Sequence, residues 1–257
     1  MKIHKSAIVH QKAKLADSVS IGPCALIGEN VVIGADTVIG AHCVIEGRTT
    51  IGKANRIFTG VVIGSPPQDL KYRGERSYIE IGDNNSIREY VTVNPGTAQD
   101  EKTVIGNNNL VMAYSHIAHN CILKDNTIIA NGGTLAGHVI IESKAIIGGL
   151  VAIHQFTRIG RLSIVGGCSK VVQDIPPFST CDGHPARVYS VNSIGLKRSG
   201  VSGKDCLDLK KAFKILFFSH LSLKTAIEKL EQEFSNSEFV SYLINFVKKS
   251  KRGISRR

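Results

Sequence analysis

The stretch that decides the fold is LIGENVVIGADTVIGAHCVIEG, residues 26–47, in which an aliphatic residue returns at every sixth position. The same register runs from Ile3 to Val171, and 26 of its 29 positions are aliphatic, so the repeat governs most of the chain. A period of six fits neither an amphipathic helix nor a simple alternating strand. It fits a short strand, a tight corner and another short strand, and three such sides close one coil of 18 residues. The repeat therefore predicts a parallel β-helix with its aliphatic residues stacked inside.

Two features qualify the repeat. A glycine often follows the aliphatic residue, as at Gly22 and Gly148, and we expect it to supply the unusual dihedral angles of the corners. The register breaks within residues 65–78 and 94–103, which are rich in proline, glycine and charge, and it resumes in phase after each. The three exceptions are Asp69, Glu75 and Gln99. We predict that these two segments are loops that project from a corner of the three-sided coils. Loops on a rigid scaffold often carry function.

The six-residue repeat ends at Val171, and the pattern of the sequence changes after it. The two expected domains are a β-helix over residues 1–190 and an α-helical subdomain over 191–257. Apolar spacing in the second part predicts three short helices, the first from about Ser202 and the others capped by Ser222 and Ser237. The residues expected on the buried face of the first helix are Leu207, Leu209, Phe213, Leu216 and Phe217.

Charge and cysteine content indicate the environment of the protein. The net charge is +11, and residues 191–257 hold 14 Lys and Arg against 6 Asp and Glu, a surplus of +8 that predicts an acidic partner. The six cysteines form no CxxC pair, which favours reduced thiols and a cytoplasmic location. The N-terminus has no signal-peptide pattern, and the longest apolar run, residues 145–156, is too short for an integral membrane segment.

Four histidines interrupt the second half of the repeat: His116, His119, His138 and His154. Adding 18 to residue 119 reaches Gly137 and adding 36 reaches Gln155, so the coils should bring these positions and their neighbours into one column. None of the four histidines occupies an interior position. Such a column suits two chemistries, a zinc ion with an open coordination position or a neutral histidine that acts as a general base. The spacing does not choose between them.

Several motifs resemble those of one enzyme family. They are QDLKYRGE (68–75), IREYVTVNPGT (87–97), HIAHNC (116–121), LAGHV (135–139), AIHQF (152–156), VGGCS (165–169), QDIPPF (173–178) and GLKRSG (195–200). The chain resembles the hexapeptide-repeat, left-handed β-helix acyltransferases, and specifically the UDP-N-acetylglucosamine O-acyltransferase family of lipid A synthesis. The hexapeptide repeat is shared by many transferases, whereas these motifs in this order are specific, and the likeness spans essentially the whole chain.

The resemblance implies that a 3-hydroxyacyl group passes from acyl carrier protein to the 3-hydroxyl of UDP-N-acetylglucosamine. It implies that His119 is the general base and that the Gly137 N–H is the oxyanion donor. The implied substrate-binding residues are Gln68, Asp69, Lys71, His116, His138, His154, Gln155, Asn192 and Arg198. Gly167 and Lys170 are implied to set the acyl-chain length. The family also implies a cytoplasmic homotrimer without metal, cofactor or nucleic acid, whose basic tail docks the carrier protein.

The chain departs from the family pattern at four positions: Asn94, Asn120, Ile194 and Ser199. Asn120 stands where many members have aspartate, so it either holds the His119 ring through its carbonyl oxygen or points away and leaves that role to another group. Asn94 stands where some members have histidine, Ile194 replaces a frequent glutamate, and Ser199 a frequent arginine. The alternatives are N-acylation of a 3-amino analogue of the sugar nucleotide, a zinc-dependent hydratase of the same fold, and a purely structural scaffold.

Overall fold

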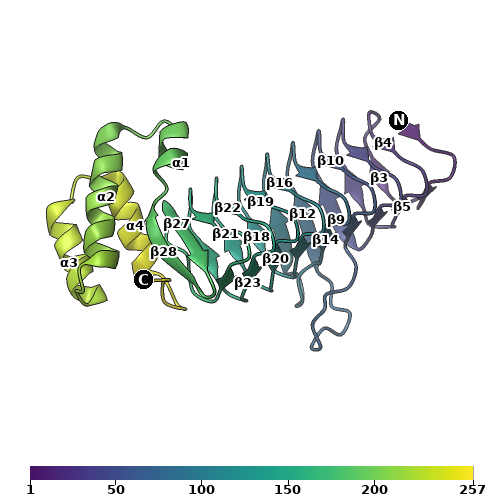
Figure 1. Cartoon of the computed structure of the whole chain (residues 1–257). Helices are drawn as coiled ribbons and strands as arrows, with labels where there is room; N and C mark the ends of the chain where they lie inside the picture. The colour runs from purple at the N-terminus through teal and green to yellow at the C-terminus, as the bar shows by residue number, and fades with distance from the viewer. Residues whose placement is uncertain (257) are drawn as a thin grey trace.

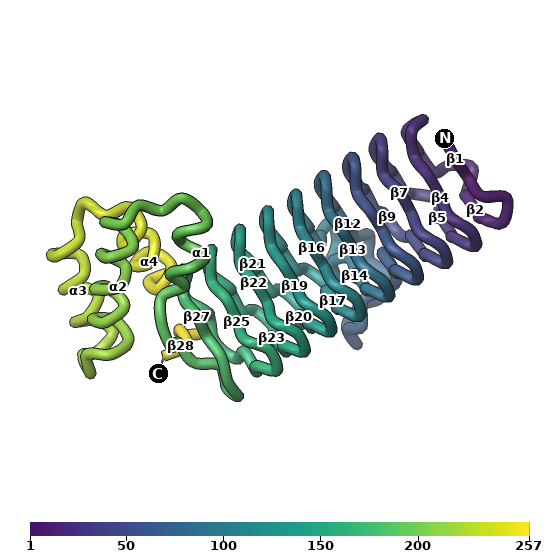
Figure 2. The backbone as a smooth tube through the Cα atoms, turned by 45° about the horizontal axis from the view of Figure 1, so that its top comes forward, coloured from purple at the N-terminus to yellow at the C-terminus, as the bar shows by residue number. Residues whose placement is uncertain are grey.

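The structure is a computed structural model that describes residues 1–256. The chain forms an elongated three-sided prism of stacked coils, with the N-terminus at one end and a group of helices at the other (Figure 1). The tube view shows each coil lying flat against the next, with one loop projecting from the middle of the stack (Figure 2). The predicted parallel β-helix with helices at its C-terminal end is confirmed.

Three sheets form the sides of the prism. The eleven-stranded sheet contains β1 (Lys2–Ile3), β4 (Ser20–Ile21), β7 (Val38–Ile39), β10 (Arg56–Ile57), β13 (Ser86–Ile87), β16 (Leu110–Val111), β19 (Ile128–Ile129), β22 (Ile146–Ile147), β25 (Ile164–Val165), β27 (Ser179–Gly183) and β28 (Ala186–Val191). The nine-stranded sheet contains β2 (Ile8–Val9), β5 (Leu26–Ile27), β8 (Val44–Ile45), β11 (Val62–Ile63), β14 (Thr92–Val93), β17 (His116–Ile117), β20 (Thr134–Leu135), β23 (Ala152–Ile153) and β26 (Lys170–Val171). The eight-stranded sheet contains β3 (Lys14–Leu15), β6 (Val32–Ile33), β9 (Arg48–Ile51), β12 (Tyr78–Ile81), β15 (Lys102–Ile105), β18 (Ile122–Leu123), β21 (Ile140–Ile141) and β24 (Arg158–Ile159).

The aliphatic register forms the core, as the repeat predicts. Ile57 pairs with Ile39 in the preceding coil and with Ile87 across the first loop, and Ile87 in turn pairs with Val111 across the second. All four side chains are buried. Burial of each such side chain contributes about 1.5–3 kcal/mol before conformational entropy is subtracted. The insertions therefore leave the stacking of the coils unchanged.

The expectation that the repeat glycines supply unusual dihedral angles is wrong for most of them; Gly64, with φ of 97°, is an exception. The left-handed corner positions are held mostly by other residues, such as Asn120 and Phe156, with φ of 61° and 63°. Gly22 and Gly148 are not among the positive-φ positions within residues 1–256. They are needed for space, because a Cβ on Gly22 would lie 2.8 Å from the carbonyl carbon of Gly40 in the next coil.

Both loops leave the prism at one edge, where the nine-stranded sheet meets the eight-stranded sheet. We call this edge the loop corner; it comprises residues 64–77, 94–101, 119–120, 137–138 and 155–156. The first loop connects β11 to β12 and the second connects β14 to β15. In the following coils the same edge turns at His119, Gly137 and Gln155. The fold thus places both insertions beside the predicted histidine column.

The C-terminal segment contains four helices: α1 (Ser193–Arg198), α2 (Gly203–Phe218), α3 (Leu223–Glu233) and α4 (Glu238–Lys248). The predicted caps are confirmed, since Ser222 and Ser237 accept hydrogen bonds from the first turns of α3 and α4. The sequence pattern missed α1, and Leu207 is 52% exposed rather than on the buried face of α2. Within residues 1–256, no helix is both long and apolar enough to cross a membrane.

Buried polar contacts fasten α4 and the segment after it to the last coils. Glu142, 5% exposed, accepts hydrogen bonds from the Tyr242 hydroxyl at 2.7 Å and from Arg158 at 3.2 Å. Asp174, 1% exposed, accepts from the backbone N–H of Arg158 at 2.8 Å and from the Ser250 hydroxyl at 2.7 Å. The helices are therefore held to the prism by two buried carboxylates as well as by apolar packing.

Candidate active site

The loop corner stacks the predicted column of residues. The backbone N–H of His138 donates to the carbonyl of His119 at 3.0 Å, and the N–H of Phe156 donates to the carbonyl of Gly137 at 3.1 Å. The His119 and His138 rings meet edge to face at 5.2 Å, and the His138 ring stacks on Phe156 at 4.5 Å. The column that the 18-residue period predicts is confirmed.

The tautomer of His119 follows from its neighbours. The side-chain oxygen of Asn120 accepts from the backbone N–H of Thr97 at 3.2 Å and from the Thr97 hydroxyl at 3.1 Å. A backbone N–H can only donate, so this oxygen, and not the amide nitrogen, faces Thr97. The same oxygen lies 2.9 Å from His119 Nδ1. Nδ1 therefore carries the proton and Nε2 presents a lone pair. Of the two roles considered for Asn120, the structure supports the one in which it holds the ring.

The first loop brings Asp69 to the open side of the imidazole. Asp69 Oδ2 lies 3.9 Å from His119 Nε2, which is too long for a hydrogen bond. The loop is shaped locally by the backbone N–H of Lys71, which donates to Asp69 Oδ1 at 2.9 Å. Gln68 and Lys71 are exposed beside it. The base of the loop is held by Asn94, whose amide donates to the carbonyl of Ser65 at 3.1 Å.

The His119 ring lies directly against Gly137. A Cβ built on Gly137 would lie 2.3 Å from Cε1 and 2.5 Å from Nε2 of the ring, well inside van der Waals contact. Within residues 1–256, the backbone N–H of Gly137 has no hydrogen-bond partner. A free N–H next to the imidazole is positioned to meet a group that His119 also contacts.

The histidines around His119 differ in environment. Burial, with a smaller effect of nearby His119, lowers the pKa of His116 below its usual value of 6.5. Burial first, and His119 second, also lowers the pKa of His138. Both rings therefore favour the neutral form near pH 7, and His116 Nδ1 lies 2.7 Å from the Thr92 hydroxyl. His154 and Gln155 lie on the next coil and are exposed.

Four predicted residues do not meet His119 within one chain. Gly167 lies at the corner between the eleven-stranded and nine-stranded sheets, and Lys170 begins β26 with an exposed side chain. Asn192 caps α1, accepting from the N–H of Gly195 and donating to the carbonyl of Leu162, both at 2.9 Å. Arg198 is exposed in the last turn of α1.

The sequence reasoning missed three residues that shape the site: Thr97 and Glu101 of the second loop, and Phe156. Thr97 orients Asn120, Glu101 accepts from the Asn120 amide at 2.7 Å, and Phe156 supports the His138 ring. Phase alone could have located Phe156, because it stands 18 residues after His138. The two loop residues lie outside the repeat, and nothing in its period places them.

A groove begins at the column and runs toward the C-terminal segment. Its volume is about 640 Å³. Its lining is apolar near Phe156 and basic at the far end, and it comprises Asn120, Ile122, His138, Ile140, Phe156, Arg158, Asp174, Lys249, Lys251 and Arg252. In the described part of the chain, no group of three or more His, Cys, Asp or Glu side chains is arranged to hold a metal ion.

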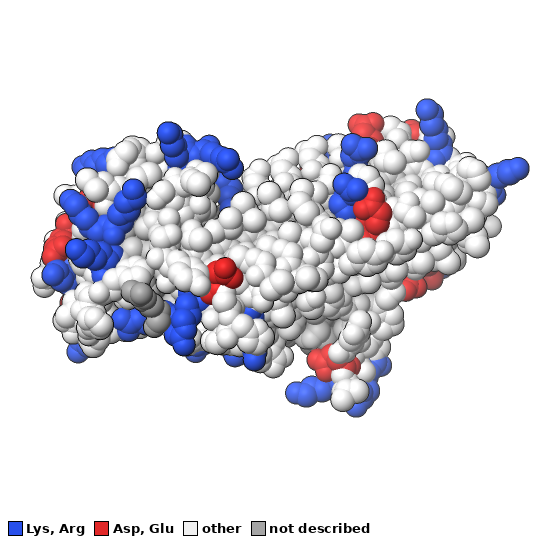
Figure 3. Space-filling model, in the orientation of Figure 1, with Lys and Arg blue, Asp and Glu red and all other residues white. Residues whose placement is uncertain are grey.

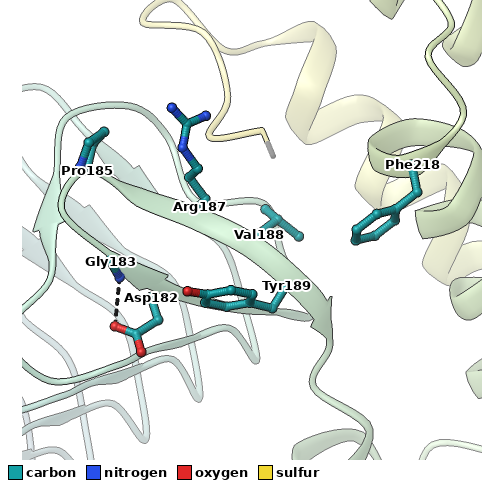
Figure 4. A pocket seen from close by; sticks show the side chains of 7 residues that line it. All are labelled: Asp182, Gly183, Pro185, Arg187, Val188, Tyr189 and Phe218. Carbon is teal, nitrogen blue, oxygen red and sulfur yellow. Dashed lines mark hydrogen bonds between the residues drawn. The ribbon is translucent and has the colours of Figure 1, made fainter.

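A second pocket, of about 450 Å³, lies between the β27–β28 hairpin and the end of α2 (Figure 4). Its lining residues are Asp182, Gly183, Pro185, Arg187, Val188, Tyr189 and Phe218. None of the site residues predicted from the sequence belongs to it. The groove at the loop corner is therefore the candidate active site.

Comparison with known proteins gives consistent matches. The family described as "Udp N-acetylglucosamine O-acyltransferase; Domain 2" matches residues 174–255, and "Bacterial transferase hexapeptide (six repeats)" matches 102–137. The acyl-[acyl-carrier-protein]–UDP-N-acetylglucosamine O-acyltransferase of Thermodesulfovibrio yellowstonii is 50% identical over 99% of both chains. That of Gloeothece citriformis is 53% identical over 82% of this chain and 76% of its own. The crystal structure of UDP-N-acetylglucosamine O-acyltransferase from Moraxella catarrhalis superposes with a TM-score of 0.95, at 41% identity over the full length of both chains.

Proposed function

This chain belongs to the UDP-N-acetylglucosamine O-acyltransferase family, and we propose that it carries out the reaction for which the family is named. The enzyme transfers a 3-hydroxyacyl group from the thioester of acyl carrier protein to the 3-hydroxyl of UDP-N-acetylglucosamine, the first step of lipid A biosynthesis. The curated relatives are named for this acyl donor and this acceptor. The observation that best supports the mechanism in this chain is the fixed tautomer of His119, whose Nε2 lies beside Gly137 and accepts no hydrogen bond from residues 1–256.

In the first step His119 Nε2 accepts the proton of the sugar 3-hydroxyl while its oxygen attacks the thioester carbonyl carbon. The Nδ1 proton stays hydrogen-bonded to Asn120, which keeps the ring in position as it becomes an imidazolium. The tetrahedral intermediate then expels the thiolate of the carrier's pantetheine arm. That thiolate takes the proton from Nε2 and leaves as a thiol, so the base returns to its starting state.

The negative charge on the intermediate needs a donor, and the Gly137 N–H is the group that we assign. It lies beside the imidazole and has no partner among residues 1–256. His116 and His138 are held toward the neutral form, so each can donate one N–H and accept one hydrogen bond from the sugar or diphosphate. Asp69, facing Nε2 across 3.9 Å, is placed to bind a sugar hydroxyl next to the reacting one.

The groove at the loop corner matches the donor arm in chemistry. Its apolar part, around Ile140 and Phe156, suits an acyl or pantetheine chain. The cationic side chains at its far end suit the phosphate that joins the pantetheine arm to the carrier protein. The helices beyond it carry exposed Lys and Arg, visible as blue patches at the helical end of Figure 3. This basic surface is where we place the acidic carrier protein.

A homotrimer would complete the site. Asn192, Arg198, Gly167 and Lys170 lie on other edges or coils of the prism than His119. A neighbouring prism that turns such an edge toward the loop corner would supply the nucleotide contacts and the end of the acyl groove. We therefore propose that each active site lies between two subunits.

The direct test is an acyl-transfer assay with purified protein and 3-hydroxyacyl carrier proteins of several chain lengths. Each donor is offered UDP-N-acetylglucosamine and its 3-amino analogue. We expect transfer to the hydroxyl acceptor, with kcat reduced about 10²–10⁴-fold in His119→Ala. His10→Ala, an exposed histidine in the first coils, is the matched control and should keep full activity. Near-normal turnover in His119→Ala would remove His119 as the base, and preference for the amine would change the acceptor.

A further inference from the structure

The second loop places a carboxylate behind the residue that orients His119. The Asn120 amide nitrogen donates to Glu101 Oε2 at 2.7 Å, and the same oxygen accepts from the backbone N–H of Ala98 at 3.1 Å. The Glu101 side chain is thereby fixed at the base of the loop. The three side chains form an unbroken series of hydrogen bonds, His119 to Asn120 to Glu101.

We propose that Glu101 is a positioning residue for the transfer reaction and supplies the negative charge that Asn120 lacks. The inference rests on the proposed function of His119 as the base. The carboxylate accepts from the amide nitrogen, which keeps the amide oxygen turned toward the ring and the proton on Nδ1. It also polarises the amide, and the stronger dipole stabilises the imidazolium that forms during the reaction.

Other charged or titratable groups near the ring act from different sides. Asp69 faces Nε2, where the substrate hydroxyl has to bind, so it cannot support Nδ1. His138 contacts the ring edge, and His116 lies near enough for His119 to lower its pKa. Glu101 is the carboxylate that reaches the Nδ1 side, through the Asn120 amide.

The same geometry explains why residue 120 is not aspartate here. An aspartate at position 120 would put a carboxylate oxygen where the Asn120 amide nitrogen now lies. That oxygen would face Glu101 Oε2 at about the present 2.7 Å. Two such groups either share one proton or move apart, because both cannot stay ionised at that separation. Asn120 and Glu101 are therefore a matched pair, in which the amide suits the carboxylate.

Four variants test the pair: Glu101→Gln, Asn120→Asp, the double variant and Asp100→Asn as the control. Asp100 is the neighbouring carboxylate and pairs with Arg76 instead of Asn120. For each protein we would measure kcat, KM for both substrates, the pH dependence of kcat/KM and Tm. Glu101→Gln keeps an oxygen for the Asn120 amide but removes the charge. We expect its kcat to fall about fivefold and both KM values to stay unchanged. The acid limb, meaning the rise of kcat/KM on the acidic side of the pH profile, should move to lower pH by about half a unit.

The double variant gives the sharper expectation. Asn120→Asp alone should lose activity about tenfold or more, because its carboxylate opposes Glu101. Adding Glu101→Gln should restore activity, since the amide introduced at position 101 can donate to the carboxylate introduced at position 120. The double variant should also place the acid limb above that of the natural protein. Glu101→Asp, which keeps the charge, should leave the acid limb in place and serves if Glu101→Gln does not fold.

Three results would overturn the inference: an acid limb of Glu101→Gln that superimposes on the natural one, an equal shift in Asp100→Asn, or no rescue in the double variant. A failed inference can be distinguished from a failed mechanism. If the natural protein transfers acyl groups and His119→Ala does not, the base stands whatever Glu101 does.

Discussion

His119, the proposed base, has three unlike residues around its ring. Asn120 fixes its proton, Gly137 leaves room for its ring and Asp69 faces its free nitrogen. None of these contacts resembles the aliphatic stacking that forms the fold. A single methyl group or a single charge at these positions is therefore expected to change the chemistry while the coils remain intact.

Gly137→Ala tests the space under the ring. The new methyl would lie 2.3 Å from His119 Cε1, so the ring has to leave its place over the 137 N–H. We expect kcat to fall about 100-fold or more, as for the loss of an oxyanion donor. Tm should change little, because the methyl displaces the His119 ring and leaves the aliphatic core in place. Kinetics and calorimetry on the purified variant give both numbers. Gly203→Ala, where a Cβ meets open space, is the control and should match the natural protein in activity. Unchanged kcat in Gly137→Ala would contradict the geometry of the ring.

At the scale of elements, the strands of two residues gain their order from the coils above and below them. The repeat ends after β26, and the last coils are covered by the β27–β28 hairpin and α4. The buried carboxylates Glu142 and Asp174 join the last coils to Tyr242 of α4 and to Ser250 after it. A buried carboxylate makes the attachment of the helices depend on pH.

Asp174→Asn tests this dependence. Burial raises the pKa of Asp174 above its usual 3.8, so the native state binds this proton more tightly than the unfolded chain does. Its contribution to stability is greatest below the unfolded pKa and is lost as pH rises through the native one. We therefore expect the Tm of the natural protein, relative to that of Asp174→Asn, to be higher at pH 4 than at pH 7. Calorimetry of both proteins across this range measures the difference. A difference that is constant with pH, or that grows toward pH 7, would rule out this role.

At the scale of the molecule, charge is distributed unevenly along the prism. Residues 191–257 carry a surplus of +8, most of the net charge of +11. Lysines and arginines are spread over the helical end in Figure 3, and Lys249, Lys251 and Arg252 line the far end of the groove. An acidic carrier protein attracted to that end would meet the groove that leads to His119.

This arrangement predicts a salt-dependent KM for the carrier protein. Exposed charges are screened beyond about 8 Å at physiological ionic strength, so the KM for the acyl donor should rise as salt is added. Lys251→Glu should raise the same KM several-fold at low salt. Lys5→Glu, at the opposite end of the prism, is the control and should leave it unchanged. Steady-state kinetics at several salt concentrations measure both effects. A KM that is independent of salt and of Lys251 would place the docking surface elsewhere.

The sequence by itself determined the prism, because aliphatic residues that recur with a period of six can be buried only by stacked coils. It determined the column of His119, Gly137 and Gln155 for the same reason, since equal phase in a helical repeat means vertical alignment. It also located both loops, where the phase breaks. It misjudged most of the repeat glycines, whose role is close packing between coils and not corner geometry.

Only the tertiary structure decided how the loop residues reach His119. Asp69, Thr97 and Glu101 lie in loops, outside the repeat, so no period relates their positions to that of His119. Asp69 faces the ring directly, whereas Thr97 and Glu101 act on it through Asn120. These contacts form because both loops leave the prism at the same edge. The proton on His119 Nδ1 is fixed by the same encounter, through an asparagine whose orientation depends on a backbone N–H 23 residues earlier in the chain. The period of the repeat determines which residues stack in neighbouring coils. Contacts between the loops, which have no period, depend on where each loop lies in space.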